Sequence, residues 1–198
     1  MSIGQTDSSP NTSSTLGTMI VVVGPSGAGK DTLIDYALER MGKHPRLHHV
    51  RRVITRSSDA GGELHEGVDD AEFERRRLSG AFCVSWSAHG LSYGIPASAK
   101  DATELGAVLI ANGSRLALAD FREIFLKLLV INVIARPEVL AARLSGRGRE
   151  SVSEISRRLE RSGVEVCGDF EVVTLDNSGD VCVAGEAFLA IVRDLLAH

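Results

Sequence analysis

The chain has 198 residues, with 22 basic and 26 acidic side chains and a net charge of −4. This length suits one α/β domain with a substantial core, and the acidic balance excludes a generally basic nucleic-acid binder. No apolar run approaches the roughly 20 residues of a membrane span, and we expect no secretory signal at the N-terminus. The three cysteines, Cys83, Cys167 and Cys182, form no CxxC pair, which predicts buried free thiols in a reducing cytoplasm.

Residues 1–18 contain mostly Ser, Thr, Gly, Asn and Pro. A segment with so little apolar surface cannot offset the entropy of ordering, so we expect a flexible tail. Residues 19–198 are expected to form a single domain.

A glycine-rich loop follows the first apolar run, Met19 to Val23, which predicts a buried strand. Glycines in the spacing Gly24-x-x-x-x-Gly29-Lys30 let backbone N–H groups turn toward phosphate oxygens. Lys30 would reach the outer phosphates, and the following helix N-terminus adds donors and a positive dipole. The alternative is a glycine turn between core elements. The predicted nucleotide-binding residues are Gly24, Pro25, Ser26, Gly27, Ala28, Gly29, Lys30, Asp31 and Thr32.

The loop departs from the usual pattern directly after its lysine. The residue that is normally a Ser or Thr, whose hydroxyl holds Mg²⁺, is Asp31, and the hydroxyl comes one position later at Thr32. Either Asp31 or Thr32 is therefore the expected Mg²⁺ ligand.

A basic segment follows the helix predicted over 31–41. Residues 43–56 contain no acid, and their second half alternates like a strand that ends near Thr55. A strand that brings Arg52 and Arg56 to one side predicts a second anion site, for a phosphorylated acceptor. The alternative is a solvated edge strand with scattered arginines.

The next segment reads as a small inserted acceptor-binding lobe over 55–96, between core segments 19–54 and 97–198. It contains a turn at Gly61-Gly62-Glu63, a charged helix over 69–79, a strand over 81–88, and a turn over 89–96 that carries Tyr93. The arginines of the charged helix are expected to form a solvated face.

The remaining chain alternates helices and strands, which predicts a parallel sheet covered by helices on both faces. We expect helices over 96–104, 116–125 and 181–196, a helix starting at Pro137, and strands over 107–111, 128–134 and 171–175. Asn112 and Arg115 follow a strand end, where α/β proteins place their ligands, although an ordinary turn is equally compatible. Six arginines within 143–161 suggest a mobile lid, about 143–158, over a bound triphosphate; a charged surface hairpin is the alternative.

These motifs, in this order, resemble the guanylate kinase superfamily of phosphate-loop kinases. The resemblance rests on GPSGAGKDT, on Thr55-Arg56, on the Tyr93-Gly94 turn and on the RLSGRG segment at Arg143 to Gly148. It implies that Arg56 and Tyr93 hold an acceptor phosphate. It also implies catalytic residues that stabilise the transferring phosphoryl group: Lys30, Arg143, Arg147 and Arg158.

Two departures from the guanylate kinase pattern concern the acceptor site. Guanylate kinases have a second arginine three residues after the equivalent of Arg56, where this chain has Asp59. They also read guanine with a Glu in the strand at Val84-Ser85 and with an acid near Asn112, and neither is present in the sequence. Guanine N–H groups would be left unpaired, which disfavours this substrate.

The whole pattern, including Ala60-Gly61-Gly62-Glu63 and Asn112-Gly113-Ser114-Arg115, closely resembles the ribose 1,5-bisphosphate phosphokinase family. This resemblance implies ATP as co-substrate, Mg²⁺, and the formation of 5-phosphoribosyl 1-diphosphate in bacterial phosphonate breakdown. Arg52, Arg56 and Arg115 become candidates for the two phosphates of a small sugar acceptor, with no nucleic-acid or membrane partner. A nucleoside monophosphate kinase and a non-catalytic guanylate-kinase-like binding module are the alternatives, and the oligomeric state stays open.

Overall fold

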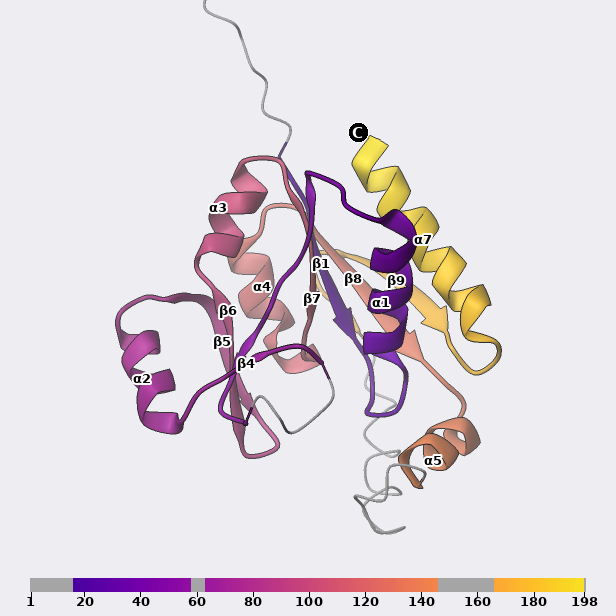
Figure 1. The fold of residues 1–198 in the computed structure, drawn as a ribbon, viewed down its shortest axis with the longest axis horizontal. Coiled ribbons are helices and arrows are strands. Elements are labelled where there is room, and N and C mark those ends of the chain that lie inside the picture. Colours follow the sequence, from indigo (N-terminus) through magenta and orange to yellow (C-terminus); the bar gives the residue numbers. More distant parts are fainter. Residues whose placement is uncertain (1–15, 58–62, 146–165, 198) are drawn as a thin grey trace, which may run out of the picture.

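A computed structural model describes residues 16–57, 63–145 and 166–197. Within these residues, a five-stranded sheet in the order β2-β7-β1-β8-β9 forms the centre of the molecule (Figure 1). Every pairing in this sheet is parallel, as the alternation of strands and helices predicted. The strands are β1 Met19–Val23, β2 Leu47–His49, β7 Val108–Asn112, β8 Leu128–Ile134 and β9 Glu171–Asp176.

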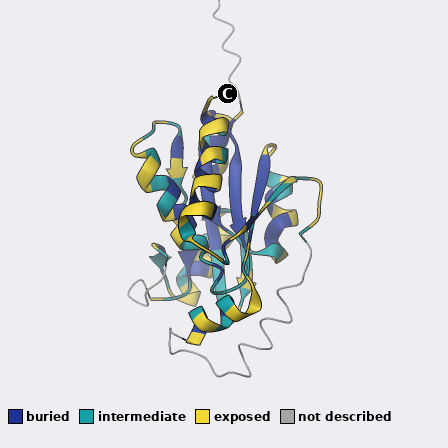
Figure 2. Ribbon diagram, turned by 90° about the vertical axis from the view of Figure 1, so that its right-hand side faces the viewer, coloured by how far each residue is buried: buried dark blue, intermediate teal, exposed yellow. Residues whose placement is uncertain are grey.

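Helices cover both faces of this sheet, which confirms the predicted layers (Figure 1). Ile20 and Val22 of β1 pack in one core with α1 and α7, whereas Val21 and Val23 pack in a second core with α3 and α4. Both faces are apolar because successive β1 side chains point to opposite sides, and Figure 2 shows the strands buried between helices with exposed outer faces. The helices are α1 Lys30–Met41, α3 Ser98–Glu104, the short 3₁₀ helix η2 Arg115–Ala117, α4 Leu118–Ile124, α5 Pro137–Ser145 and α7 Val181–Ala197.

A second, smaller sheet lies to one side, in the order β4-β3-β6-β5. Its strands are β3 Val53–Ile54, β4 Glu66–Gly67, β5 Phe82–Ala88 and β6 Leu91–Pro96, and α2 Asp70–Leu78 accompanies them. The strand predicted to end near Thr55 is present as the two-residue β3, which joins the small sheet. The sequence analysis missed β2, which precedes it and joins the large sheet.

The predicted turn over 89–96 is also wrong. Its first two residues, His89 and Gly90, form a tight connection with φ of 53° and 74°, and the rest is β6, which pairs antiparallel with β5. Small and polar residues such as Ser92 and Gly94 hide the strand pattern. Gly94 is nevertheless required, because a Cβ there would lie 2.7 Å from the Phe82 ring.

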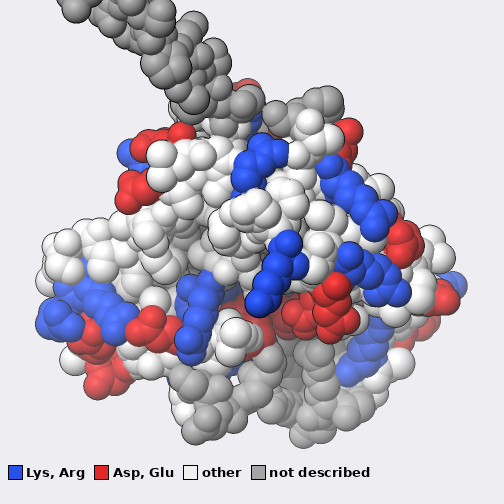
Figure 3. Space-filling view, turned by 45° about the horizontal axis from the view of Figure 1, so that its top comes forward, with Lys and Arg blue, Asp and Glu red and all other residues white. Residues whose placement is uncertain are grey.

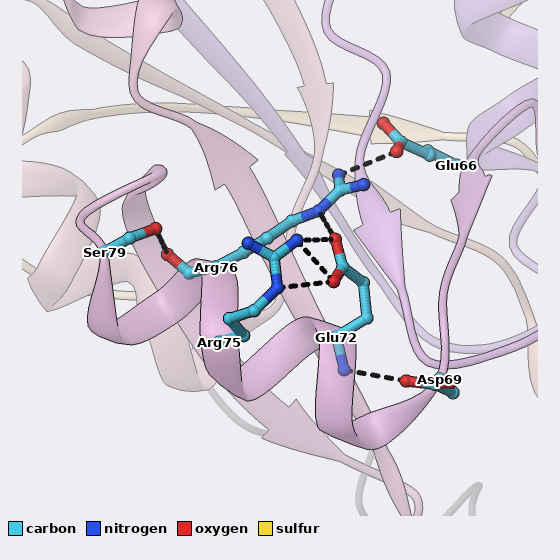
Figure 4. Close-up of polar contacts among 6 residues, drawn as sticks. All are labelled: Glu66, Asp69, Glu72, Arg75, Arg76 and Ser79. Carbon is cyan, nitrogen blue, oxygen red and sulfur yellow. Dashed lines mark hydrogen bonds and ion pairs between the residues drawn. The ribbon is translucent and has the colours of Figure 1, made fainter.

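Helix α2 begins at a side-chain cap and carries the charged surface that the sequence predicted. Asp69 accepts a hydrogen bond of 2.7 Å from the Glu72 backbone N–H, and Glu72 pairs with Arg75 and Arg76 along the helix (Figure 4). Arg76 reaches further to Glu66 at the start of β4. These arginines are paired locally, so they carry no separate anion site.

Charge is dispersed on the face in Figure 3, where basic and acidic side chains are interspersed. In the described part of the chain, no helix is long and apolar enough to cross a membrane. The loop after β1 lies between the small sheet on one side and α5 on the other (Figure 1), so both the predicted acceptor lobe and the start of the predicted lid flank the phosphate loop.

Candidate active site

The loop between β1 and α1 has a backbone that side chains would obstruct. Gly24, Gly27 and Gly29 have φ of 150°, 83° and 88°. A Cβ on Gly24 would lie 2.2 Å from the carbonyl oxygen of Val133, and one on Gly29 would lie 2.4 Å from Nδ2 of Asn177. The loop therefore keeps its backbone N–H groups unscreened by side chains, as a phosphate cradle requires.

Lys30 turns its ammonium group back into this loop. Its Nζ donates to the carbonyl oxygens of Gly24 at 3.0 Å and Pro25 at 3.2 Å. Burial lowers the pKa of Lys30 from 10.5 to about 8; nearby Asp31 and Glu63 act to raise this pKa, and Arg52 acts to lower it. The lysine thus lies where charged groups from both sides of the site meet.

Asn177 supports the loop and was missed by the sequence analysis. It is 2% exposed and follows β9, and its Nδ2 donates to the Ala28 carbonyl oxygen at 2.7 Å. Arg143 of α5 donates to the Asn177 carbonyl oxygen at 2.9 Å and lies 3.4 Å from that of Gly27. A signal was present, because Asn177 comes at the carboxyl end of a parallel strand, as do Asn112 and the phosphate loop itself.

On the acceptor side, an arginine is held against two aromatic rings. Trp86 and Tyr93 stack at 5.3 Å between ring centres, and the Arg52 guanidinium lies 4.9 Å from the Tyr93 ring centre and 5.6 Å from that of Trp86. Its Nε donates to Glu63 at 2.9 Å, in an ion pair whose side chains are only 12% and 9% exposed. Arg52, predicted to bind phosphate, is therefore paired with a carboxylate.

Asn112 joins this ion pair to the phosphate loop. The residue is 3% exposed, and its Nδ2 donates to Asp31 Oδ1 at 2.5 Å and to Glu63 Oε2 at 2.6 Å. The expectation that no acid lies near Asn112 is thus wrong: two carboxylates reach it from other segments. The sequence analysis assigned Glu63 only to a turn. A signal was present, because Glu63 and Asp59 are the first two acids after the basic segment.

The other predicted acceptor arginines lie close by. Arg115 donates to Asn132 Oδ1 at 2.9 Å, and burial lowers the pKa of its guanidinium. Arg56 lies 3.4 Å from Nδ1 of His65. The buried His65 ring contacts the carbonyl oxygens of Ser57 and Glu63, at 3.2 Å and 2.9 Å, and so ties two backbone segments of the acceptor lobe together.

The structure therefore gathers many of the predicted site residues around one loop. Arg147 and Arg158 lie outside the described residues, as does Asp59. Thr32 is exposed on α1. The individual roles remain predictions. Some predicted residues belong to the loop and the start of α1 or are joined to them through the contacts above: Lys30, Asp31, Arg52, Tyr93, Asn112, Arg115 and Arg143.

No protein-family model matches this sequence, but curated relatives do. The ribose 1,5-bisphosphate phosphokinase PhnN of Agrobacterium fabrum is 56% identical over 175 residues, which cover 88% of this chain and 96% of that protein. Its namesake from Rhizobium etli is 48% identical over 189 residues, covering 96% of each chain. That from Brucella melitensis is 47% identical over 179 residues, covering 90% of this chain and 93% of the relative.

Solved structures support the fold. A guanylate kinase from Anaplasma phagocytophilum superposes with a TM-score of 0.63 at 19% identity, covering 90% of this chain and 86% of that one. A sugar kinase from a Janibacter species gives a TM-score of 0.52 at 17% identity, covering 89% and 95%. At such low identity these likenesses concern architecture alone, and they confirm the predicted α/β fold of phosphate-loop kinases.

Proposed function

We propose, because this chain belongs to the ribose 1,5-bisphosphate phosphokinase family, that it transfers the γ-phosphoryl group of ATP to ribose 1,5-bisphosphate. The observation that carries the proposal is 56% identity to a relative of that name across 88% of the chain. The products would be 5-phosphoribosyl 1-diphosphate and ADP, in phosphonate catabolism. A cytoplasmic location is part of the proposal and is supported by the three free cysteines. The prediction that all three thiols are buried is wrong, because Cys167 and Cys182 are exposed and Cys83 is half-buried.

The proposed reaction needs no general base. An oxygen of the phosphate on C1 attacks the γ-phosphorus, and the bond from that phosphorus to the oxygen bridging the β-phosphate breaks, so the electron pair leaves with ADP. A phosphate monoester loses its second proton near pH 6, so the attacking oxygen is already ionised. Lys30, the loop amides and arginines such as Arg143 would align the reactants and neutralise the charge of the transferring group.

Mg²⁺ fits the oxygen donors beside the loop. Among the described residues, no three or more His, Cys, Asp or Glu side chains form a closed metal site. Mg²⁺ in kinases is commonly held by one or two protein oxygens together with substrate phosphates and water. Asp31 or Thr32 would supply the protein oxygen, and the ion would neutralise phosphate charge when bound.

A nucleoside monophosphate kinase is the second candidate. The carboxylates of Asp31 and Glu63 beside Asn112 could accept hydrogen bonds from the N–H groups of guanine, which weakens the sequence-based argument against that base. A non-catalytic binding module is disfavoured because Lys30 is present and lies inside the loop.

The decisive experiment offers the purified chain ATP and Mg²⁺ with ribose 1,5-bisphosphate, GMP or AMP as acceptor. We expect ADP release with the sugar bisphosphate, and a new diphosphate signal in ³¹P NMR. The kcat/KM for the sugar bisphosphate should exceed that for either nucleotide by at least about 100-fold, a margin typical of sites that read specific polar groups. Preferred turnover of GMP would overturn the proposal.

A further inference from the structure

We call the side chains of Asp31, Glu63 and Asn112 the acceptor cluster. All side-chain hydrogen-bond donors of this cluster are already bonded within it. The Asn112 side chain has two N–H donors, and its nitrogen bonds to both Asp31 and Glu63. The reverse orientation of this amide would place its oxygen against two carboxylates, so the assignment follows from charge. What remains in the cluster is acceptor capacity.

In the part of the chain that the structure describes, each of the three side chains keeps at least one free position for accepting a hydrogen bond. A carboxylate offers about four acceptor positions, and Glu63 uses three of them, two for Arg52 and one for Asn112. Asp31 uses one for Asn112. The Oδ1 atom of Asn112 is buried and accepts no hydrogen bond from any residue in the described ranges. A buried acceptor without a donor destabilises a protein unless a ligand supplies one.

A ligand group that fits this cluster must therefore bring hydrogen-bond donors. A fully ionised phosphate has none, so the cluster is unsuited to a phosphate of the acceptor. A sugar hydroxyl has one donor and carries no charge to be desolvated. The neighbouring arginines are a better match for the phosphates.

The position of the cluster selects one hydroxyl. Asp31 follows Lys30 directly at the start of α1 and accepts the hydrogen bond from Asn112, and the Lys30 ammonium lies against the loop carbonyl oxygens, so the cluster borders the point of phosphoryl transfer. In ribose 1,5-bisphosphate the attacking oxygen belongs to the phosphate on C1, and the hydroxyl on C2 is one carbon away. The hydroxyl on C3 is farther from the reacting atoms.

We propose that Glu63, in the acceptor cluster with Asp31 and Asn112, accepts a hydrogen bond from the C2 hydroxyl of the sugar and is a specificity residue of this kinase. The inference rests on the proposed function. Arg52 then becomes a positioning residue, since its guanidinium is bonded to Glu63 and lies over Trp86 and Tyr93. This replaces the phosphate-binding role predicted for it from the sequence.

The first test changes the substrate and leaves the protein intact. The ratio of kcat/KM for ribose 1,5-bisphosphate to that for 2-deoxyribose 1,5-bisphosphate should be about 10 to 100 in the natural chain, the range expected for a hydrogen bond to a charged group. No turnover of either compound would refute the proposed function. Equal turnover of both would refute the C2-hydroxyl inference and leave the proposed function standing.

The second test changes the residue. In Glu63→Gln the ratio of the two kcat/KM values should fall to about threefold or less. The neutral amide is a weaker acceptor than the carboxylate, and its NH₂ group is a donor that cannot bond to the NH₂ group of Asn112. Glu66→Gln is the matched control, since Glu66 pairs with Arg76 outside the site, and its ratio should equal that of the natural chain. Far-ultraviolet circular dichroism and thermal unfolding verify that both variants are folded.

Two outcomes of this second test contradict the inference. One is a folded Glu63→Gln variant that keeps the full ratio. The other is a variant in which turnover of GMP falls while the ratio for the sugars is unchanged, which would assign Glu63 to a purine base. If Glu63→Gln does not fold, the ratio in the natural chain decides.

Discussion

At the scale of single residues, the site is governed by the cost of placing charges together away from water. Lys30 lies among Asp31, Glu63, Arg52 and Arg115, and burial is the main reason that its pKa falls to about 8. In the chain without nucleotide, a fraction of the lysine amines is therefore neutral in mildly alkaline solution. Bound phosphates would restore the proton, because an anion favours the ammonium form.

This predicts a pH-dependent activity. The kcat/KM for ATP reports the free enzyme, so it should decrease as the pH rises through about 8, where Lys30 loses its charge. The kcat should persist to higher pH because the nucleotide raises the pKa. Initial rates measured from pH 6 to 10, below and above saturation with ATP, test this. A kcat/KM that stays level to pH 9.5 would contradict it.

Lys30→Met separates catalysis from stability. We expect kcat to fall by at least about 100-fold, as for other charge-stabilising groups, while the midpoint of thermal unfolding at pH 7 rises by about 2 °C or more. The sign follows from linkage: the folded chain holds this proton less tightly than the unfolded chain, so the penalty from Lys30 is full below pH 8 and fades as the pH approaches 10.5. The higher unfolding midpoint of the variant should therefore return to that of its parent between pH 8 and 10.5. A variant less stable than its parent at pH 7 would be incompatible with a destabilising charge.

Gly29 tests the shape of the loop. Alanine at φ 88° is strained, and its Cβ would lie 2.4 Å from Asn177 Nδ2, so the bond from Asn177 to the Ala28 carbonyl oxygen should break. We expect Gly29→Ala to weaken ATP binding by about tenfold or more, measured by calorimetry, with about 1–3 kcal/mol lost in stability. Gly42→Ala is the control, because Gly42 has φ 62° but nothing within 4 Å. Equal effects of the two changes on ATP affinity would show that strain alone matters.

At the scale of elements, sequence reasoning worked where one local pattern determined the structure. The apolar run of β1, its glycine loop and the amphipathic α7 were predicted correctly because burial repeats along each of them. Strand β6 was missed because its polar and small residues are held by pairing with β5, which is not a local property. Glu63 was missed for the same reason: its partners Arg52 and Asn112 lie 11 and 49 positions away.

Helix α2 offers a test of a local signal. Its N-terminal cap, Asp69, bonds to the Glu72 N–H, so Asp69→Ala should lower the free energy of unfolding by about 1 kcal/mol. Asp70→Ala is the comparison, since Asp70 lies in the first turn and no cap bond involves it; its loss should cost a few tenths of a kcal/mol through the helix dipole. Urea unfolding measures both. A larger effect at position 70 would assign the stability of the helix start to charge rather than to capping.

At the scale of the whole molecule, the sheet fixes the site because β1 lies at its centre and α1 follows directly from the loop. Helix α1 packs against α7, and the two share one core with the sheet. The position of the α1 N-terminus therefore depends on packing between α1 and α7, away from the phosphate loop. Any change that separates α1 from α7 should therefore displace Lys30, the first residue of α1.

Gly185 of α7 lies directly against α1. A Cβ there would lie 2.5 Å from the ring of Tyr36 on α1, and that ring cannot move freely, since its hydroxyl bonds to Glu186 at 2.8 Å and the Arg40 guanidinium lies 3.6 Å from its centre. Alanine is the better helix former by up to about 1 kcal/mol, whereas overpacking costs typically 1–3 kcal/mol.

We expect the overpacking cost to dominate, so Gly185→Ala should lower the free energy of unfolding and also reduce ATP affinity, because α1 carries Lys30 at its start. Adding Tyr36→Leu should recover part of the loss, and the double-mutant cycle measures the coupling between the two positions. Urea unfolding and calorimetric titration with ATP provide the two readouts. A Gly185→Ala chain more stable than its parent would mean that helix propensity outweighs the contact, and that α1 and α7 can separate without disturbing the phosphate loop.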